Sequence, residues 1–187
     1  MIKNFFWKVG QSIGFLSNLD VTIHHYDNYS PKLGRNVKVD VYLTKDFYFR
    51  PVARHSVLFI NDGQDMAAMQ LQATLEKLMQ TRAIGRTIVV AIHANENRIQ
   101  EYGVASQADY KNRGSLAGKY SQFIVEELYL FIRDHYRLSR RMDTIAFAGM
   151  SLGGLSAFDI VWHHARLFTK QAFFWLFLVA LASDEPK

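Results

Sequence analysis

The sequence predicts an α/β fold in which a mostly parallel β-sheet carries helices on both faces. Three short apolar runs, residues 56–61, 87–92 and 144–148, are typical of strands that are buried on both faces. Segments with helical spacing separate these runs and follow the last one. This order of strands and helices indicates a parallel sheet covered by helices.

The first two predicted strands differ from the three buried ones. In residues 21–26 and 37–43 apolar and polar side chains alternate, which is typical of strands with one buried face. The segment that joins them is rich in turn-forming residues, namely Asn28, Ser30, Pro31 and Gly34. We therefore expect an antiparallel hairpin on the N-terminal side of the sheet.

Three helices are predicted between and after the buried strands. The first covers about 66–82, where apolar residues recur at mostly helical spacing: Met69, Leu71, Leu75, Leu78 and Met79. A polar loop over 95–115 leads into the second, over about 116–136. The third follows residue 151 and has its apolar positions at Leu155, Phe158, Ile160, Val161 and Trp162.

Length and composition fit one globular domain and exclude several classes of function. A chain of 187 residues with 49% hydrophobic residues can bury a sizeable core. The net charge of +5 comes from scattered basic residues, so neither nucleic acid nor a membrane is an expected partner. The densest basic cluster is Arg137, Arg140 and Arg141. Since the chain has no cysteine, a disulfide scaffold and a thiolate nucleophile are excluded.

No targeting or membrane-spanning segment is predicted. The first eight residues have no apolar core followed by a small-residue cleavage site, so we expect a cytoplasmic protein. We expect Phe5, Phe6 and Trp7 to pack on the domain. The longest apolar run, residues 172–182, is shorter than the roughly 20 residues that a membrane helix needs.

One motif carries chemistry. Gly149-Met150-Ser151-Leu152-Gly153 follows the third buried strand and precedes a helix, which is the required context of a Gly-x-Ser-x-Gly nucleophile elbow. The serine must occupy a strained strand-to-helix turn that raises its hydroxyl above the sheet. Glycines flank it because side chains there would collide with the neighbouring strand and helix. At the helix N-terminus the backbone N–H of Leu152 is expected to face the oxyanion that forms during acyl transfer.

With this motif the chain resembles the enterochelin esterase and esterase D branch of the α/β-hydrolases, a group of serine esterases. Three segments carry the resemblance and together span most of residues 37–168: residues 57–65 (Val-Leu-Phe-Ile-Asn-Asp-Gly-Gln-Asp), residues 91–95 with 98–103, and residues 149–158. The resemblance implies an α/β-hydrolase-type sheet and hydrolysis of a small-molecule carboxylic ester through an acyl-Ser151 intermediate. It implies no metal and no organic cofactor.

The resemblance also implies that the loop after the first buried strand supplies a second oxyanion donor, on the backbone of Gly63 and Gln64. From the residues alone, Asp62-Gly63 is equally well a simple turn. In α/β-hydrolases the triad acid follows the serine along the chain. We therefore interpret Asp62 and Asp65 as loop and helix-capping residues rather than as the acid.

Two residues are candidates for the substrate pocket. His93 ends a predicted strand, on the edge where parallel sheets bind their ligands, and Asp62 lies in the neighbouring loop. The alternative for His93 is a hydrogen-bonded loop histidine. Another group of polar side chains comprises Arg98, Glu101 and Tyr102. These residues either form a local ion pair, which is a structural role, or line the pocket, and we favour the structural role.

The triad acid and histidine are not found in this chain. His163 and His164 are the only histidines after Ser151, and they lie 12 and 13 positions along the same helix, about 18 Å away. In the family, later units of about 30 residues carry the acid and then the histidine, more than the 19 residues after Phe168 can supply. We therefore expect one incomplete α/β-hydrolase domain that lacks the C-terminal strands. It comprises an N-terminal extension (1–20), a family-like part (21–168) and an aberrant apolar tail (169–187).

The tail suggests truncation or a frameshift. Relatives continue with a strand resembling Ser-Gly-Ser-Phe-Trp-Trp-Arg, and residues 175–180 can be written in codons whose next frame encodes Gly-Ser-Phe-Trp-Trp-Arg. Because we chose those synonymous codons, the frameshift is a hypothesis for the gene sequence to decide. Different codons at Leu176 or Leu178 would remove it.

Two classes of function fit these observations. The first is a serine esterase, or an acyltransferase variant of it, which we expect to be nearly inactive in this chain because the base is missing. The second is a non-catalytic α/β module that binds a ligand or partner through the same face. Ester turnover that depends on Ser151 distinguishes the two.

Overall fold

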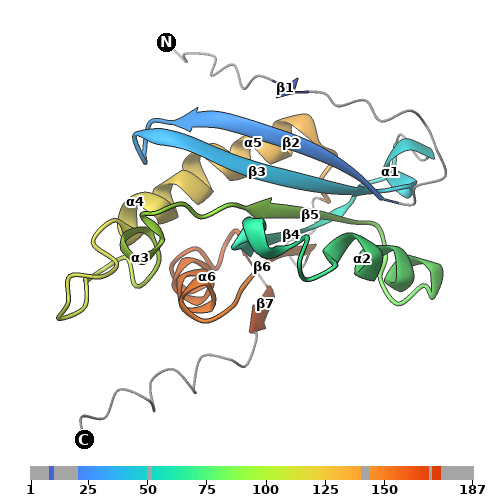
Figure 1. Ribbon diagram of the computed structural model, residues 1–187. Coiled ribbons are helices and arrows are strands. Elements are labelled where there is room, and N and C mark those ends of the chain that lie inside the picture. The colour runs from blue at the N-terminus through green and yellow to red at the C-terminus, as the bar shows by residue number, and fades with distance from the viewer. Residues whose placement is uncertain (1–8, 11–20, 50–51, 140–143, 169, 174–187) are drawn as a thin grey trace, which may run out of the picture.

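A seven-stranded sheet with helices on both faces forms the described part of the protein (Figure 1). The structure, a computed structural model, describes residues 9–10, 21–49, 52–139, 144–168 and 170–173. The strand order is β1-β2-β3-β5-β4-β6-β7. The strands are β1 (Val9–Gly10), β2 (Val21–Ser30), β3 (Arg35–Thr44), β4 (Ser56–Asn61), β5 (Thr87–Ile92), β6 (Ile145–Gly149) and β7 (Lys170–Phe173). The helices are α1 (Asp46–Phe49), η1 (Gly63–Asp65), α2 (Leu71–Gln80), α3 (Arg98–Glu101), α4 (Ala117–Gln122), η2 (Phe123–Leu128), α5 (Tyr129–His135) and α6 (Leu152–His163).

The predicted hairpin is confirmed. Strands β2 and β3 pair antiparallel over their whole length, from Val21 opposite Thr44 to Ser30 opposite Arg35. Gly34 closes the turn with a φ of 68°, a conformation that glycine adopts without steric cost. Both strands extend further toward the turn than the alternation predicts.

The predicted parallel part of the sheet is also confirmed. Strands β5, β4, β6 and β7 run parallel to one another, and β3 joins them antiparallel through β5. Side chains alternate between the two faces of these strands. Val57 and Phe59 belong to the apolar core on one face, whereas Leu58 and Ile60 belong to the core on the other. This double burial explains the continuous apolar runs in the sequence.

Each face of the sheet has its own helices. The core that contains Phe59 also takes in side chains of α4, η2, α5 and α6, including Phe123, Ile132 and Ile160. The opposite core is closed by α2 through Leu75. The helix predicted over 116–136 is thus present as the consecutive elements α4, η2 and α5, and its π-helical middle was not predicted.

The helix predicted over 66–82 is wrong at its start. The α-helix α2 begins at Leu71, because Gln70 before it has a left-handed backbone with φ 53°. Residues 66–70 instead form turns that lead out of η1. One of them, Met66, is nevertheless buried in the core beside α2.

Several predictions fall on residues that the structure does not describe. They concern Phe5, Phe6 and Trp7, the basic residues Arg140 and Arg141, and the tail beyond residue 173. Within the described ranges, no helix combines the length and the apolar character that crossing a membrane requires.

Candidate active site

Ser151 lies on the tight turn between β6 and α6. It is the N-terminal cap of α6, and its backbone has φ 51° and ψ −126°. A non-glycine residue in such a sparsely populated region costs about 1–3 kcal/mol, so the surrounding structure must hold it there. The side chain is partly exposed at the carboxyl end of β6. Conformation and position are those of a nucleophile elbow.

The flanking glycines allow the turn to form. A Cβ atom on Gly149 would lie 2.3 Å from the carbonyl oxygen of Gly153, closer than two such atoms can approach. A Cβ atom on Gly153 would lie 2.7 Å from a carboxylate oxygen of Asp62 and 3.2 Å from the Cβ atom of Asn61. The first glycine thus lets the strand meet its own helix, and the second lets the helix meet the neighbouring loop.

The start of α6 presents free N–H groups beside Ser151. Its first hydrogen bonds are those of Gly154 and Leu155, which donate to the carbonyl oxygen of Ser151 at 2.9 and 3.1 Å. The N–H groups of Leu152 and Gly153 precede these bonds, and in the first turn of a helix such groups have no acceptor within the helix. They are available to an anion at the helix N-terminus.

Strand register brings the loop after β4 next to the elbow. Strands β4 and β6 are parallel neighbours, and Ile60 pairs with Ala148. Two or three residues further on, Asp62 and Gly63 reach the same level as the turn that holds Ser151. The side-chain amide of Asn61 fastens the two together by donating to the carbonyl oxygen of Gly153 at 2.8 Å.

This loop has a strained and tightly packed backbone. Asp62 is left-handed, with φ 63° and ψ 46°, and Gly63 begins the short helix η1. A Cβ atom on Gly63 would lie 2.7 Å from the ring of His93 and 2.9 Å from the backbone of Ala91. The side chain of Gln64 is tied down as well, because its carbonyl oxygen accepts the N–H of Ala94 at 2.9 Å.

Buried polar side chains connect the loop to the helices below it. The hydroxyl of Tyr120 donates to the side-chain oxygen of Asn61 at 2.6 Å, and the N–H of Asp62 donates to the hydroxyl of Tyr102 at 3.3 Å. Burial raises the pKa of both tyrosines well above the ordinary value, so both stay neutral hydrogen-bonding groups. Sequence reasoning placed Asn61 in the segment 57–65 that carries the resemblance but gave it no role, and it missed Tyr120. A further signal for Asn61 is that it is a polar residue ending an apolar strand, whereas Tyr120 has no signal.

Asp62 forms a two-point ion pair with Arg98. The Nε atom of Arg98 donates to Oδ1 of Asp62 at 2.6 Å, and its terminal nitrogen donates to Oδ2 at 2.8 Å. Hydrogen bonding to Asp62 raises the pKa of Arg98. The Asp62 side chain is only 2% exposed, so its contacts favour a role in holding the loop. Its role as a pocket residue stays a prediction.

Comparison with known families identifies the chain. The model of the family named Esterase, described as "Putative esterase", matches residues 30–174, which is 145 of the 187 residues. The chain belongs to this esterase family. No curated protein sequence matches it.

Solved structures of esterases share the fold of this family member. A ferulic acid esterase superimposes with a TM-score of 0.67 and 21% identity, over 82% of this chain and 57% of that one. The enterochelin esterase of Shigella flexneri gives 0.63 and 20%, over 81% and 34%. An IroE-like serine hydrolase from Shewanella oneidensis gives 0.62 and 22%, over 80% and 49%. The esterase-family chain thus spans between about a third and a little over half of the length of these proteins.

The seven histidines of this family member all lie in the described residues, and their contacts are away from Ser151. His163 and His164 are at the far end of α6, where they bond to Asp159 and Ser121. His55 precedes β4, at the opposite end of the sheet from the elbow. The remaining four also have their partners elsewhere. His24 bonds to the hydroxyls of Tyr136 and Tyr48, His25 and His93 bond to Asp40, and His135 bonds to the carbonyl oxygen of Phe131.

His93 is the histidine that lies beside Gly63 of the loop after β4. It follows β5, and its Nε2 atom bonds to Oδ2 of Asp40 at 2.8 Å, while His25 bonds to the other oxygen of Asp40 at 2.6 Å. His93 is thus a hydrogen-bonded histidine at the carboxyl edge of the sheet, and its part in a substrate pocket remains a prediction. Arg98 and Glu101 do not pair with each other, because Glu101 binds Arg35.

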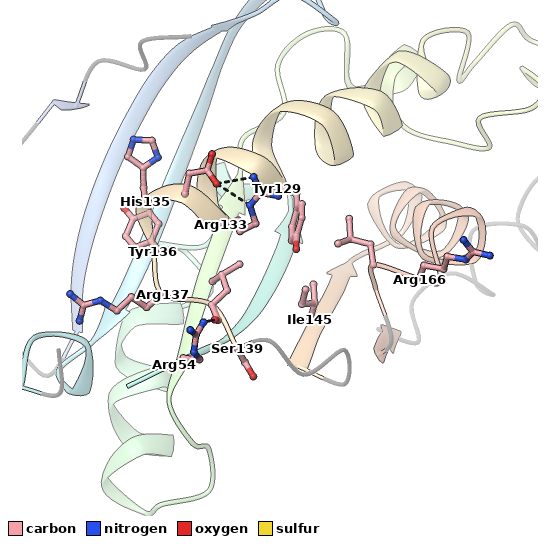
Figure 2. A pocket seen from close by; sticks show the side chains of 12 residues that line it. Arg54, Tyr129, Arg133, His135, Tyr136, Arg137, Ser139, Ile145 and Arg166 are labelled. Carbon is pink, nitrogen blue, oxygen red and sulfur yellow. Dashed lines mark hydrogen bonds and ion pairs between the residues drawn. The ribbon is translucent and has the colours of Figure 1, made fainter. Parts of the chain in front are cut away.

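A cavity of about 600 Å³ lies at the other end of the sheet (Figure 2). Arg54 precedes β4 and Ile145 begins β6, so this cavity opens at the amino ends of the strands, opposite to Ser151. The side chains of Arg137 and Arg166 extend to opposite sides of it in Figure 2 rather than converging. It is therefore no substrate site for Ser151. No cluster of histidine and carboxylate side chains suited to a metal ion occurs in the described ranges.

Proposed function

We propose that this chain carries the nucleophile and the oxyanion hole of a serine esterase. The observation that carries the proposal is the backbone of Ser151, which is held at φ 51° and ψ −126° between β6 and α6 by two glycines that permit close backbone contact. A strained serine at this position raises its hydroxyl above the carboxyl edge of the sheet. A turn used only for packing has no need of that strain.

The reaction follows from the groups around Ser151. The Oγ atom attacks the carbonyl carbon of a carboxylic ester and passes its proton to a base, so that the carbonyl oxygen becomes an oxyanion. The bond to the alcohol then breaks, and the alcohol leaves with a proton while the acyl group stays on Ser151. Water attacks the acyl-serine in the same way and releases the acid.

Two backbone N–H groups are our candidates to bind the oxyanion. Leu152 supplies one at the N-terminus of α6, where the helix dipole also favours negative charge. Gln64 supplies the other from the loop that strand register sets beside the elbow, with Gly63 as the residue that lets the loop pack there. Removing one such donor from a serine hydrolase lowers kcat by about 10²–10³.

The base is the missing part of this site. Each of the seven histidines is held elsewhere in the structure, as described above. Without a base the serine remains a neutral alcohol, and only the residual rate from oxyanion binding is left. We therefore propose that the chain by itself hydrolyses esters slowly.

The test supplies the base from solution. Purified protein is incubated with p-nitrophenyl acetate and increasing imidazole, beside Ser151→Ala as the matched control for imidazole's own reaction with the ester. The expected result is an imidazole-dependent rate in the wild type that exceeds the rate of Ser151→Ala. Equal rates at every imidazole concentration would refute a catalytic serine and favour the non-catalytic binding module.

The natural substrate class is a separate question. Solved structures with this fold are named as esterases for ferulic acid and for enterochelin. We propose a small-molecule carboxylic ester for this chain too. An ester of ferulic acid in the same imidazole assay, compared with the acetate, shows whether the site prefers an aromatic acyl group.

A further inference from the structure

The side-chain carboxylate and the backbone N–H of Asp62 are both hydrogen-bonded to residues of one short segment. Its carboxylate accepts two hydrogen bonds from Arg98, and its N–H donates to the hydroxyl of Tyr102. Arg98 begins α3 and Tyr102 follows the end of that helix. The guanidinium of Arg98 also lies over the ring of Tyr102, 5.0 Å from its centre, which adds a cation–π contact. Arg98 and Tyr102, which lie at the start and just after the end of α3, thus hold both the side chain and the backbone of Asp62.

The observed conformation of Asp62 depends on these contacts for two reasons. Its backbone is left-handed, a conformation that aspartate adopts more readily than most residues but that still costs free energy, which these contacts offset. Its carboxylate is buried, and a buried charge without a partner is strongly destabilising. The planar guanidinium of Arg98 satisfies both oxygens at once, as no lysine can.

The conformation of Asp62 sets the direction of the backbone that follows it. The N–H of Asp65 donates to the carbonyl oxygen of Asp62 at 3.0 Å, and the N–H of Met66 donates to that of Gly63 at 3.2 Å. These two bonds define the turn that contains Gln64. If Asp62 left its left-handed conformation, the turn would lose these bonds and the backbone of Gln64 would change direction.

We propose that Arg98 is a positioning residue for the oxyanion hole. It fixes Asp62 in the left-handed conformation and thereby aims the N–H of Gln64 at the oxyanion formed at Ser151. The inference rests on the proposed function for the identity of the anion. The claim that Arg98 holds the loop stands on the contacts alone.

The chain offers a matched control. Arg35 binds Glu101 through two hydrogen bonds, and Glu101 is only 1% exposed, so this second pair has the same type and a similarly buried carboxylate, although Arg35 is 15% exposed and Arg98 31%. Arg35 lies in β3 and contacts no residue of the loop over 62–66 in the described hydrogen bonds. Since Glu101 ends α3, breaking this pair tests what the loss of a buried ion pair on the same helix does while Arg98 and Asp62 stay paired.

The experiment compares Arg98→Met, Arg98→Lys and Arg35→Met. Hydrogen exchange is followed in peptides that contain the amides of Asp65 and Met66. In parallel, the rate at which a fluorophosphonate labels Ser151 is measured in imidazole, where the serine oxygen displaces fluoride from phosphorus and its proton passes to imidazole. We expect Arg98→Met to speed exchange of the two amides at least tenfold and to slow labelling by about 10- to 100-fold, because oxyanion donors act only when placed to within about 1 Å. Arg98→Lys should be intermediate.

Arg35→Met should leave both readouts within about threefold of wild type, although it lowers the melting temperature. Equal loop exchange in Arg98→Met and wild type would overturn the inference, and so would an equal effect of Arg35→Met on the loop. If Arg98→Met does not fold, Asp62→Asn/Arg98→Met replaces it, since asparagine tolerates the left-handed backbone and leaves no buried charge. If wild type is not labelled at Ser151, the proposed function fails, and the exchange result still decides whether Arg98 holds the loop.

Discussion

Substitution of Gly149 by alanine tests the elbow with a single methyl group. The added Cβ atom would lie 2.3 Å from the carbonyl oxygen and 2.4 Å from the carbonyl carbon of Gly153. Cβ atoms do not approach other atoms closer than 3.0 Å, so the strand end and the helix start must separate by about 0.7 Å. The atoms in the way belong to backbone, and no side chain can swing aside to make room.

The cost follows from this forced separation. Overpacking of a well-packed site costs about 1–3 kcal/mol of unfolding free energy. In a chain of this size each kcal/mol lowers Tm by about 2–4 °C, so we expect a fall of about 2–12 °C. A displacement approaching 1 Å at the nucleophile also slows reaction by up to about 100-fold. We therefore expect labelling of Ser151 to slow by one to two orders of magnitude.

Thermal unfolding and the imidazole-supported labelling rate measure the two effects. Gly85→Ala is the matched control, because nothing lies within 4 Å of the Cβ atom that it adds. It should change neither Tm nor labelling. If Gly149→Ala has the Tm and labelling rate of Gly85→Ala, strand and helix do not meet at the elbow as described, and the reasoning fails.

Three further predictions concern stability. Burial raises the pKa of Tyr102, so the stability that its hydroxyl contributes is complete below about pH 10 and is lost as the pH rises further. Tyr102→Phe should therefore lower the free energy of unfolding in urea by about 1–3 kcal/mol at pH 8, and by less above pH 10. For Asp40, burial opposes ionisation, but hydrogen bonds from His93 and His25 outweigh it and lower the pKa. Asp40→Asn should therefore cost about 1.5–3 kcal/mol at pH 5, a gap that urea unfolding should find closing as the pH falls below about 4. Phe59 is fully buried in the core on one face of the sheet, and Phe59→Ala should cost about 3–5 kcal/mol in the same assay at neutral pH.

Features with a local cause could be predicted from the sequence. The apolar runs 56–61 and 87–92 coincide with β4 and β5. A strand that is buried on both faces appears in the sequence as one continuous apolar run, so the run marks its extent. The elbow could be predicted because its close backbone contacts admit only glycine at two fixed positions. Pattern and geometry agree wherever the constraint lies within a few residues.

Backbone detail decided by tertiary contacts could not be predicted. Gln70 is left-handed and delays the start of α2, yet glutamine is not a residue that signals this conformation. In the π-helical turn η2 each backbone hydrogen bond spans one residue more than in an α-helix, a difference too small to show in the spacing of apolar residues. The order of the strands, with β5 between β3 and β4, also leaves no mark on the local pattern.

Ion pairs between residues distant in sequence were the feature that the sequence predicted least well. Arg98 and Glu101 are three residues apart, a spacing at which side chains on a helix meet, and a local ion pair was one prediction. Instead, Arg98 binds Asp62 from 36 residues away and Glu101 binds Arg35 from 66 residues away. Sequence spacing cannot rank these alternatives, since the choice depends on which loops the sheet brings together.

The residue that a serine-directed reagent modifies is the most direct test of Ser151 as the nucleophile. Purified protein is treated with a fluorophosphonate in imidazole, digested and mapped by mass spectrometry, beside Ser151→Ala. We predict one adduct, on the peptide that contains Ser151, and its loss in Ser151→Ala. An adduct on another residue, or undiminished labelling of Ser151→Ala, would contradict the assignment of Ser151 as the nucleophile.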